Sequence, residues 1–529
     1  MKRRNFIKNT IPVALLPTFI NGQHVTAMGP NSVLGKMAAA FTDTDHVLVL
    51  VQLSGGNDGL NMVIPLDKYG ILGNARSNVL IPDTKVLKLN GTNATGLHPS
   101  MSHLQKLYND GKLNIVQNVG YPNPNYSHFR ATDIWLSGSD SNQVLNTGWQ
   151  GRYLAGEYPN FPAGYPNANM PDPLSIVIGS LVSPAFQGPA VNMAMSISDP
   201  ANFYNMINGT TDPVPNTHAG HELSYIRTVA DQTTQYATVI KAAAAKATNK
   251  STLWPAAKKN KLADQLKIVS QLIAGGLKTR VYMVNLGGFD NHSNQVDLSD
   301  HTKGVHADLL FNLSQAIEAF MDDCQLLGIA NRIMGMTFSE FGRRIVSNQS
   351  GGTDHGAAAP VILFGNQVKS GITGSSPNLP QTPTVNDNID MEHDFRQIYT
   401  TIMKDWFCLN PADVKATMLK DFTPLSIINS TCNSNAIADD IRKNSGTKLL
   451  SIYPNPMTDQ SNLSIESKGG NVLVRLYTME GKEVETLVNE NLAPGSHQIS
   501  FARKELTAGL YIVRMDHNLM VQTKTLVVQ

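Results

Sequence analysis

Four apolar runs, each followed directly by a cluster of polar residues and glycines, constrain the fold of this 529-residue chain most strongly. The runs cover residues 46–53, 113–119, 280–286 and 332–338, and helical patterns lie between them. Near-continuous apolar runs are typical of strands buried on both faces of a parallel sheet, and strand–helix alternation is typical of βαβ units. We therefore expect residues 44–430 to form an α/β domain whose mainly parallel sheet is flanked by helices.

The polar clusters after these runs supply the candidate site. Asp58 follows the first run, Asp290 and His292 follow the third, Glu340 follows the fourth, and His355 lies in a Gly-rich segment soon afterwards. Each cluster alone could be a loop hydrogen bond or a surface salt bridge. Carboxylates and imidazoles that converge from separate strand ends, however, are how a metal site is assembled. The pattern therefore favours a divalent-metal hydrolase.

Ser127 lies after the second apolar run and just before a helical pattern. At the start of a helix, exposed amide groups and the helix dipole stabilise an alkoxide or a bound oxyanion. An ordinary helix-capping serine occupies the same position, so both interpretations stay open. The glycines after the first run form neither a dinucleotide-binding motif nor a phosphate loop with a lysine, and nucleotide binding is therefore not favoured.

Composition excludes several classes of protein. The chain has 42 Lys and Arg against 41 Asp and Glu, and this near-neutral balance argues against a nucleic-acid partner. No stretch reaches the roughly 18 apolar residues of a membrane helix, so we expect no transmembrane helix in the mature protein. Of the three cysteines, Cys324 lies on a buried helical stripe, while Cys408 and Cys432 form either a disulfide or two free thiols.

The N-terminal residues resemble a twin-arginine export signal. Arg3 and Arg4 are followed by Phe6, Ile7 and Lys8 and then by a short apolar stretch that prolines interrupt. The resemblance implies a signal and linker over residues 1–40, recognition by the twin-arginine translocase, and passage through the periplasm.

The C-terminal residues resemble another targeting segment. From residue 448 short alternating strands are separated by turn pairs, which is the rhythm of a β-sandwich. The sequences of residues 451–456 and 506–513 are similar to segments of the C-terminal sorting domain of the type IX secretion system of Bacteroidetes. The resemblance implies a sorting domain over residues 448–529, a linker over 431–447, a partner in the type IX machinery, and a final place at the cell surface or in the medium. An ordinary carbohydrate-binding or immunoglobulin-like sandwich is the alternative.

The central region resembles the bacterial domain-of-unknown-function family 1501, which lies in the alkaline phosphatase and sulfatase superfamily. The matching segments are residues 53–65, 96–99, 127–138, 147–153, 287–295, 337–344, 351–356 and 394–399. The resemblance implies an alkaline-phosphatase-like fold for residues 44–430. Residues 160–270 are expected to contribute a cap that shapes access to the site.

The resemblance also implies roles for individual residues. Ser127 matches the nucleophile, and Asp58, with Asn57 as an alternative, matches the acid that follows the first strand. Asp290, His292 and His355 match ligands of a first metal. Glu340 stands where an aspartate of a second site is expected, and Phe341 occupies the place of its histidine partner. The second site is therefore expected to be weak or absent.

Three arginines are candidates for holding a negatively charged ester. Arg130 matches the arginine that follows the modified cysteine of sulfatases, and Arg343 and Arg344 follow the fourth run. A guanidinium can hold two oxygens of a phosphate or sulfate group at once. A salt bridge at the surface or the sheet edge is the plainer interpretation of Arg344.

Together these features predict an exported hydrolase of phosphate or sulfate esters. Ser127 would attack with the help of one or two divalent ions, which could be zinc, calcium or magnesium. The absence of a histidine at Phe341 sustains a second hypothesis, a surface binding or structural protein that retains the fold without turnover. Modification or binding of a surface polysaccharide is a third.

Overall fold

The computed structural model describes residues 18–20, 23–25, 44–159, 161–198, 235–429, 432, 447–467, 469–478, 482–517 and 520–529. The chain divides into two compact units. One is built mainly of Asp43–Thr431 and the other mainly of Cys432–Gln529.

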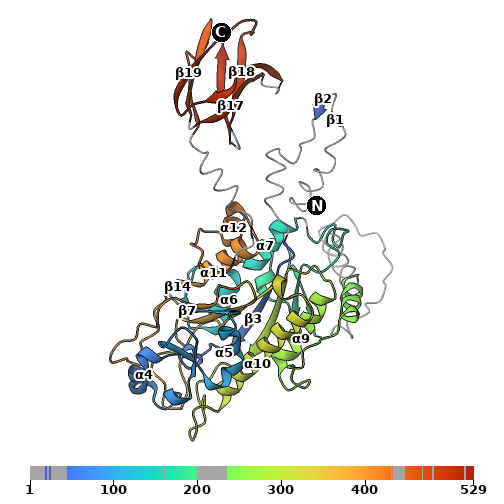
Figure 1. Cartoon of the computed structure of the whole chain (residues 1–529). Helices are drawn as coiled ribbons and strands as arrows, with labels where there is room; N and C mark the ends of the chain where they lie inside the picture. The colour runs from blue at the N-terminus through green and yellow to red at the C-terminus, as the bar shows by residue number, and fades with distance from the viewer. Residues whose placement is uncertain are drawn as a thin grey trace, which may run out of the picture. The chain divides into compact units, whose positions relative to one another are not determined.

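A nine-stranded sheet forms the centre of the first unit (Figure 1). Eight strands follow one another in the order β13-β7-β12-β11-β3-β10-β8-β9, and β14 pairs with β7. All pairs are parallel except those of β12, which runs antiparallel to β11 and β7. The strands are β3 (Val47–Ser54), β7 (Leu113–Gly120), β8 (Ser175–Ile178), β9 (Ala194–Ile197), β10 (Val281–Gly287), β11 (Ile333–Phe338), β12 (Ala359–Phe364), β13 (Gly371–Thr373) and β14 (His393–Asp394).

Helices cover both faces of this sheet. On one face lie α5 (Ser102–Asn109), α9 (Lys261–Ala274) and α10 (Val305–Leu326). On the other lie α6 (His128–Ser137), α7 (Trp149–Glu157), α11 (Phe395–Thr401) and α12 (Pro411–Met418). The predicted α/β class with a mainly parallel sheet is therefore confirmed.

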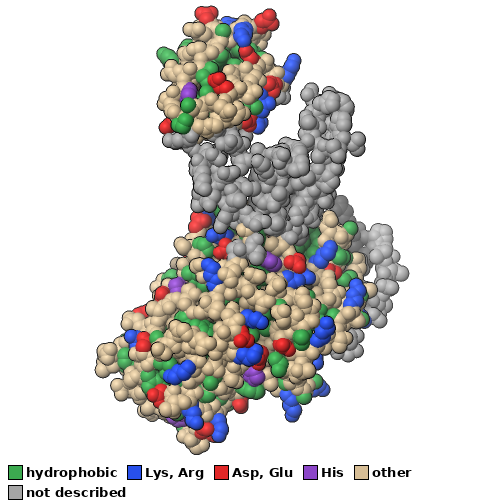
Figure 2. All heavy atoms as spheres, viewed as in Figure 1, with side chains coloured by type: hydrophobic (Ala, Val, Ile, Leu, Met, Phe, Trp, Pro, Cys, Tyr) green, Lys and Arg blue, Asp and Glu red, His purple; other side chains and the backbone are tan. Residues whose placement is uncertain are grey.

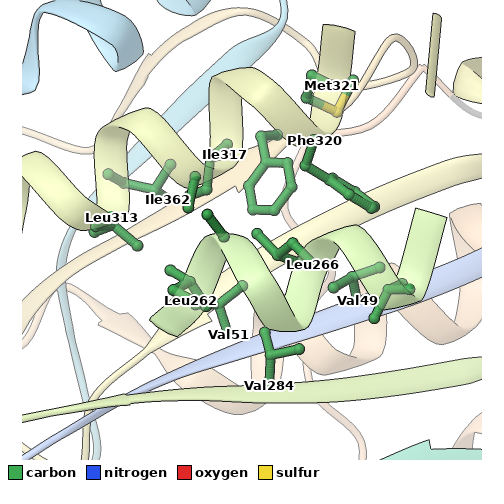
Figure 3. Close-up of a cluster of buried hydrophobic side chains, with 14 of the residues drawn as sticks. Val49, Val51, Leu262, Leu266, Val284, Leu313, Ile317, Phe320, Met321 and Ile362 are labelled. Atoms are coloured by element: carbon green, nitrogen blue, oxygen red, sulfur yellow. The ribbon is translucent and has the colours of Figure 1, made fainter. Parts of the chain in front are cut away.

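Alternation along β3 explains why this strand reads as a continuous apolar run. Val49 and Val51 face α9 and α10, where Leu266 and Phe320 pack against them (Figure 3). Leu50, the residue between the two valines, faces the opposite cluster. Successive side chains of a strand point to opposite faces, so a central strand covered on both sides must be apolar throughout.

The strand order brings the polar clusters to one edge. Since β7, β3, β10 and β11 run in the same direction, the loops that follow all four strands lie at the same edge. Strand β12 runs the opposite way and begins at that edge, so the loop before it, which contains His355, joins them. Gly55 allows these loops to approach, because a Cβ there would lie 2.4 Å from the backbone nitrogen of Asp290.

The described part of the region expected to act as a cap, residues 161–198 and 235–270, contributes to the sheet and the core. Strands β8 and β9 extend the sheet beyond β10, and α9 packs on the face shared with α10. A small antiparallel sheet is formed by β4 (Val63–Pro65), β6 (Thr95–Leu97) and β5 (Leu87–Lys88), near α4 (Tyr69–Arg76). On the face shown in Figure 2, basic and acidic side chains are interspersed.

The second unit consists of two antiparallel sheets around their own apolar core, as expected for a β-sandwich. One has the order β15-β16-β19 and the other β18-β17-β20-β21. The strands are β15 (Lys448–Tyr453), β16 (Gln460–Ser467), β17 (Gly470–Thr478), β18 (Glu483–Leu492), β19 (Gly495–Ala502), β20 (Gly509–His517) and β21 (Met520–Val528).

The structure bears on the predicted export signal, the linker, the absence of a membrane helix and the cysteines. Of residues 1–40 the structure describes two paired strands, β1 (Thr18–Ile20) and β2 (Gln23–Val25), and the rest of the export signal lies outside the described residues, as does most of the 431–447 linker. None of the described helices combines the length and apolar character needed to cross a bilayer. Cys408 and Cys432 are disulfide-bonded, and Cys324 is a buried free thiol.

Candidate metal centre

Three histidines surround the carboxylate of Asp290 at the edge where the strand ends meet. Asp290 Oδ1 lies 3.0 Å from His292 Nε2 and 3.4 Å from both His128 Nε2 and His355 Nε2. The Nε2 atoms of His292 and His355 are 2.9 Å apart. His128, Asp290 and His355 each offer a ligand atom, and these atoms all lie within 4.8 Å of one another. The structure thus brings together three of the five predicted ligands and adds His128.

Each of the three histidines has an oxygen acceptor at its other ring nitrogen. His128 Nδ1 lies 2.9 Å from Glu340 Oε1, and His292 Nδ1 lies 3.3 Å from Asp354 Oδ1. His355 Nδ1 lies 2.7 Å from the main-chain carbonyl oxygen of Tyr126. These oxygens are acceptors, so each of the three sites suits an imidazole that donates through Nδ1.

This hydrogen-bond pattern favours the binding of a cation by the Nε2 atoms. In a neutral imidazole whose Nδ1 donates, Nε2 keeps its lone pair, and all three Nε2 atoms face Asp290. A histidine that binds a metal through one nitrogen and donates the other N–H to a carboxylate or carbonyl is the usual arrangement in metalloproteins. Two lone pairs 2.9 Å apart, as at His292 and His355, repel each other unless a proton or a cation lies between them.

The spacing of the donors fits a small ion. Two ligands of a tetrahedral zinc, bound at about 2.0–2.1 Å, lie about 3.3 Å apart. Four of the separations in the cluster fall between 2.9 and 3.4 Å. Imidazole nitrogens with one carboxylate suit zinc and related ions better than calcium or magnesium, which prefer oxygen ligands. The residues present therefore fit a transition-metal ion.

Arg343 fixes the loops beneath the centre. Its guanidinium is fully buried and donates to the main-chain oxygens of Gly56 at 2.6 Å, Thr353 at 2.7 Å and Phe289 at 3.1 Å, and also to that of Gly55. It donates to Asp290 Oδ1 at 2.8 Å. With these partners the side chain joins three strand-end loops and positions Asp290, and it is not free to hold a substrate.

The charge state of Asp290 follows from these neighbours. Partial burial raises the pKa of its carboxyl, but the hydrogen bond from Arg343 and the nearby His128 and His292 outweigh it, and the pKa is lowered overall. Burial lowers the pKa of His355. Asp290 is thus charged and His355 neutral near pH 7, which are the forms that bind a metal.

Asp58 lies in a different environment from the one predicted. Its carboxylate accepts two hydrogen bonds from Arg76, at 2.8 and 3.1 Å, and one from Gln295 at 2.7 Å. Both members of the ion pair are buried. Its neighbour Asn57 accepts a hydrogen bond from His306 Nε2 at 3.0 Å. The structure therefore places Asp58 and Asn57 in a buried polar network and not at the histidine cluster.

Glu340 contacts the cluster indirectly, through the ring of His128. It is buried, and Oε1 accepts hydrogen bonds from the amide of Gly55 at 2.8 Å and from His128 Nδ1 at 2.9 Å. Phe341 is also buried, and its ring lies 4.5 Å from the ring of His355 and 4.9 Å from that of His128, centroid to centroid. The apolar ring of Phe341 thus lies beside the cluster, and Glu340 orients the ring of His128 through its Nδ1 atom.

The two remaining candidate arginines are occupied elsewhere. Arg130 pairs with Asp133 and donates to the main-chain oxygens of residues 140, 141 and 143, so it fastens the loop after α6. Arg344 donates to the main-chain oxygens of His355 and Val385. It also lies over the ring of Tyr126. Neither guanidinium has a hydrogen bond to the carboxylate of Asp290 or to a histidine ring of the cluster.

Ser127 immediately precedes α6, as the sequence predicts. Its side chain is exposed and makes no capping hydrogen bond, so the helix-cap interpretation is not what the structure shows. The next residue is His128, and the preceding carbonyl, that of Tyr126, binds His355. Ser127 therefore lies in the sequence between two residues that contribute to the centre.

Three groups of the centre are not predicted from the sequence: His128, Asp354 and the main-chain carbonyl of Tyr126. A signal is present for His128, because it directly follows Ser127 in the segment that leads from the second apolar run into the helical pattern. Asp354 stands directly before the predicted ligand His355. A main-chain acceptor such as the Tyr126 oxygen has no sequence signature at all.

A cleft of about 860 Å³ opens beside the centre. Its lining includes His128, Asp290 and Glu340 together with apolar side chains such as Phe129 and Leu181. Phe129 and Leu181 are 91% and 79% exposed. None of the described residues that line the cleft is a lysine or an arginine.

The buried network near Asp58 predicts an acid-sensitive fold. Burial lowers the pKa of His306 from 6.5 to about 4, even though the charge of Asp58 raises it. Because the unfolded chain takes up this proton more readily, the free energy of unfolding should fall as the pH drops from about 6.5 to about 4, by roughly 3 kcal/mol. Urea unfolding of metal-free protein across this range measures it.

The variant His306→Gln should show a shallower decline over the same pH range, because it keeps a donor for Asn57 and lacks the titrating ring. The control His301→Gln, at a histidine bound to the main-chain oxygen of Leu80, should decline like the unmodified chain. Equal slopes for His306→Gln and the unmodified chain would contradict this assignment.

The central region and the C-terminal region of the chain each match a known protein family. Residues 191–406 match the family described as protein of unknown function (DUF1501), and residues 451–529 match the secretion system C-terminal sorting domain. Both family resemblances seen in the sequence are confirmed, and the sorting domain indicates export to the cell surface or the medium. No curated protein matches the chain.

Solved structures similar to the chain come from sulfatases and the alkaline phosphatase superfamily. The PsFucS1 sulfatase from Pseudoalteromonas sp. is 11% identical, with a TM-score of 0.32 over 90% of this chain and 88% of that one. A protein in the alkaline phosphatase superfamily from Vibrio parahaemolyticus is 9% identical, with a TM-score of 0.32 over 94% and 88%. Ps i-CgsB in complex with k-i-k-neocarrahexaose is 9% identical, with a TM-score of 0.33 over 80% and 83%.

Proposed function

With residues 191–406 identified as a DUF1501 region and 451–529 as a secretion-sorting domain, we propose that this protein is an exported, metal-dependent hydrolase of phosphate or sulfate esters. One observation carries the proposal. The Nδ1 atoms of three histidines each lie beside an oxygen acceptor, and their Nε2 atoms all face the carboxylate of Asp290.

His128, Asp290 and His355 would hold a single ion, with His292 beside them, and zinc suits this donor set best. Such an ion would lower the pKa of an oxygen nucleophile and offset the charge that develops on the ester oxygens. Phe341 and the engagement of Glu340 with His128 argue for one ion and not two.

Ser127 is the nucleophile in this proposal. Its hydroxyl is exposed, makes no capping bond and stands at the start of α6, whose first amides point toward an incoming anion. Attack by Oγ on phosphorus or sulfur releases the alcohol and leaves an ester on Ser127. Water then hydrolyses that ester, which restores the hydroxyl and releases phosphate or sulfate.

The cleft supports an ester with an uncharged leaving group. Its apolar wall, formed in part by Phe129 and Leu181, lies beside the centre and would bury an apolar or aromatic group. With Arg130, Arg343 and Arg344 engaged in the protein, the anionic end of the substrate would rely on the ion and the helix amides.

A catalytically inactive binding protein is the second candidate. Phe341 favours it, because an apolar ring beside His128 and His355 leaves a single metal position in a superfamily that often uses two. Turnover distinguishes the two candidates.

The metal is tested by elemental analysis of the purified full chain. We expect about one equivalent of zinc, and less than about a tenth of that in His128→Gln and in His355→Gln, because each variant loses a ligand. The matched control His103→Gln, at a histidine of α5 that pairs with Glu318 of α10, should keep the full equivalent. Equal metal content in all four proteins would remove the centre from consideration.

Activity is tested on aryl phosphates, phosphodiesters and aryl sulfates. We expect Ser127→Ala to lose about 10³-fold or more of kcat/KM while it keeps its metal, because the nucleophile is removed and the ligands are not. Unchanged activity in Ser127→Ala would exclude the serine mechanism. A metal-loaded chain with no turnover on the whole panel would establish the binding protein instead.

A further inference from the structure

A second cleft, of about 530 Å³, lies in the first unit and shares no lining residue with the cleft beside the metal centre. It forms where β6 and α5 approach β7 and β13, and its size is within the ordinary range for ligand pockets. The described residues that line it include no Lys, Arg, Asp, Glu or His. Amide and hydroxyl side chains supply its polarity.

Three of these polar side chains are buried but have no hydrogen-bond partner in the described part of the chain. Thr95 on β6 is 1% exposed, Gln117 on β7 is 4% exposed and Tyr108 on α5 is 6% exposed. Their polar atoms are not among the buried ones that are sealed from solvent, so they open into the cleft. Gln117 lies in the gap between β13, which pairs with β7 up to Val116, and β14, which pairs with β7 from Val119.

Because these polar atoms open into the cleft, water or a ligand that enters it can hydrogen-bond to them, and a ligand with matching groups can replace the water. Three such groups from three different elements in one cleft indicate a ligand that would satisfy them. Because no charged side chain lines the cleft, an ionic ligand would lose its hydration there without an opposing charge.

We propose that this cleft binds a neutral carbohydrate of one or two sugar units. Sugar hydroxyls both donate and accept, which matches the amide of Gln117 and the hydroxyls of Thr95 and Tyr108. The amides of Asn90 and Asn109 extend the same chemistry along the rim. This site is independent of the proposed hydrolase activity, because it shares no residue with the metal centre.

Isothermal titration of the full chain with neutral disaccharides, namely cellobiose, maltose, lactose and xylobiose, tests the proposal. At least one should bind, and a uronic-acid disaccharide should bind more weakly. Gln117→Met, Thr95→Val and Tyr108→Phe keep the side-chain volume but remove the polar group. Each should weaken binding about tenfold, the size of one lost hydrogen bond. The control Gln143→Met, at an exposed glutamine outside the cleft, should bind as the unmodified chain does.

Thermal unfolding of the free variants provides the second readout. Because these groups have no partners in the protein, the Tm should stay the same or rise. The proposal is overturned if none of the four disaccharides binds, if all three variants bind unchanged, or if the uronic-acid disaccharide binds more tightly. A Tm that falls by several degrees in all three variants would also overturn it, because the groups would then be shown to have partners within the fold.

Discussion

Replacing Arg343 by Met should lower the free energy of unfolding by about 3–5 kcal/mol and reduce the metal content of the protein severely. The guanidinium is fully buried and joins the loops that follow β3 and β10 to the loop that precedes β12. Without it, the main-chain oxygens of Gly56 and Thr353 would lose their side-chain donor, while that of Phe289 would keep the amide of Asn291. Asp290 would also lose the donor that positions it.

The neighbouring residue provides a matched control. Arg344→Met also removes bonds to main-chain oxygens, but its guanidinium is partly exposed and contacts Val385 and His355 at the rim. We expect a loss of about 1 kcal/mol and an unchanged metal content. Arg343→Lys distinguishes the effect of the positive charge from that of the hydrogen bonds to three loops. A lysine keeps the charge but cannot bind all three loops at once. Urea unfolding and elemental analysis measure both effects, and equal losses at 343 and 344 would contradict the role given to Arg343.

The strands of the central sheet were predictable because burial on both faces demands apolar side chains throughout. The run at 46–53 became β3 (Val47–Ser54), and the run at 332–338 became β11 (Ile333–Phe338). Strand β18 in the second unit was not predicted. Its sequence is polar, and most of its side chains are exposed because it is an edge strand paired only with β17 among the described strands.

The candidate site was predictable in position but not in detail. Residues at strand ends were expected to converge, and Asp290, His292 and His355 do. The direction of each side chain depends on the turns, and these are unusual here, since Gly55 and Gly56 have φ of 122° and 77°. Those turns carry the chain so that the carboxylate of Asp58 meets Arg76. No spacing rule for carboxylates and histidines contains that information.

Asp58→Asn provides the sharpest test of this reassignment. The Asp58–Arg76 ion pair is buried on both sides, so removal of its negative charge would leave the guanidinium of Arg76 unpaired in the core. We expect the free energy of unfolding to fall by about 3–5 kcal/mol, with the metal content unchanged. Burial raises the pKa of Asp58, but Arg76, His306 and Gln295 lower it overall. The stabilisation is therefore present at neutral pH and is lost as the pH falls below the ordinary value of 3.8.

The double variant Asp58→Leu with Arg76→Met separates an unpaired charge from a lost contact. Apolar replacement of a whole buried ion pair is often neutral or stabilising, so the double variant should recover most of the stability that Asp58→Asn loses. A metal ligand would behave in the opposite way, because Asp58→Asn would then lose metal and the double variant would not regain it. Elemental analysis and urea unfolding of the same three proteins decide between the buried ion pair and the predicted ligand.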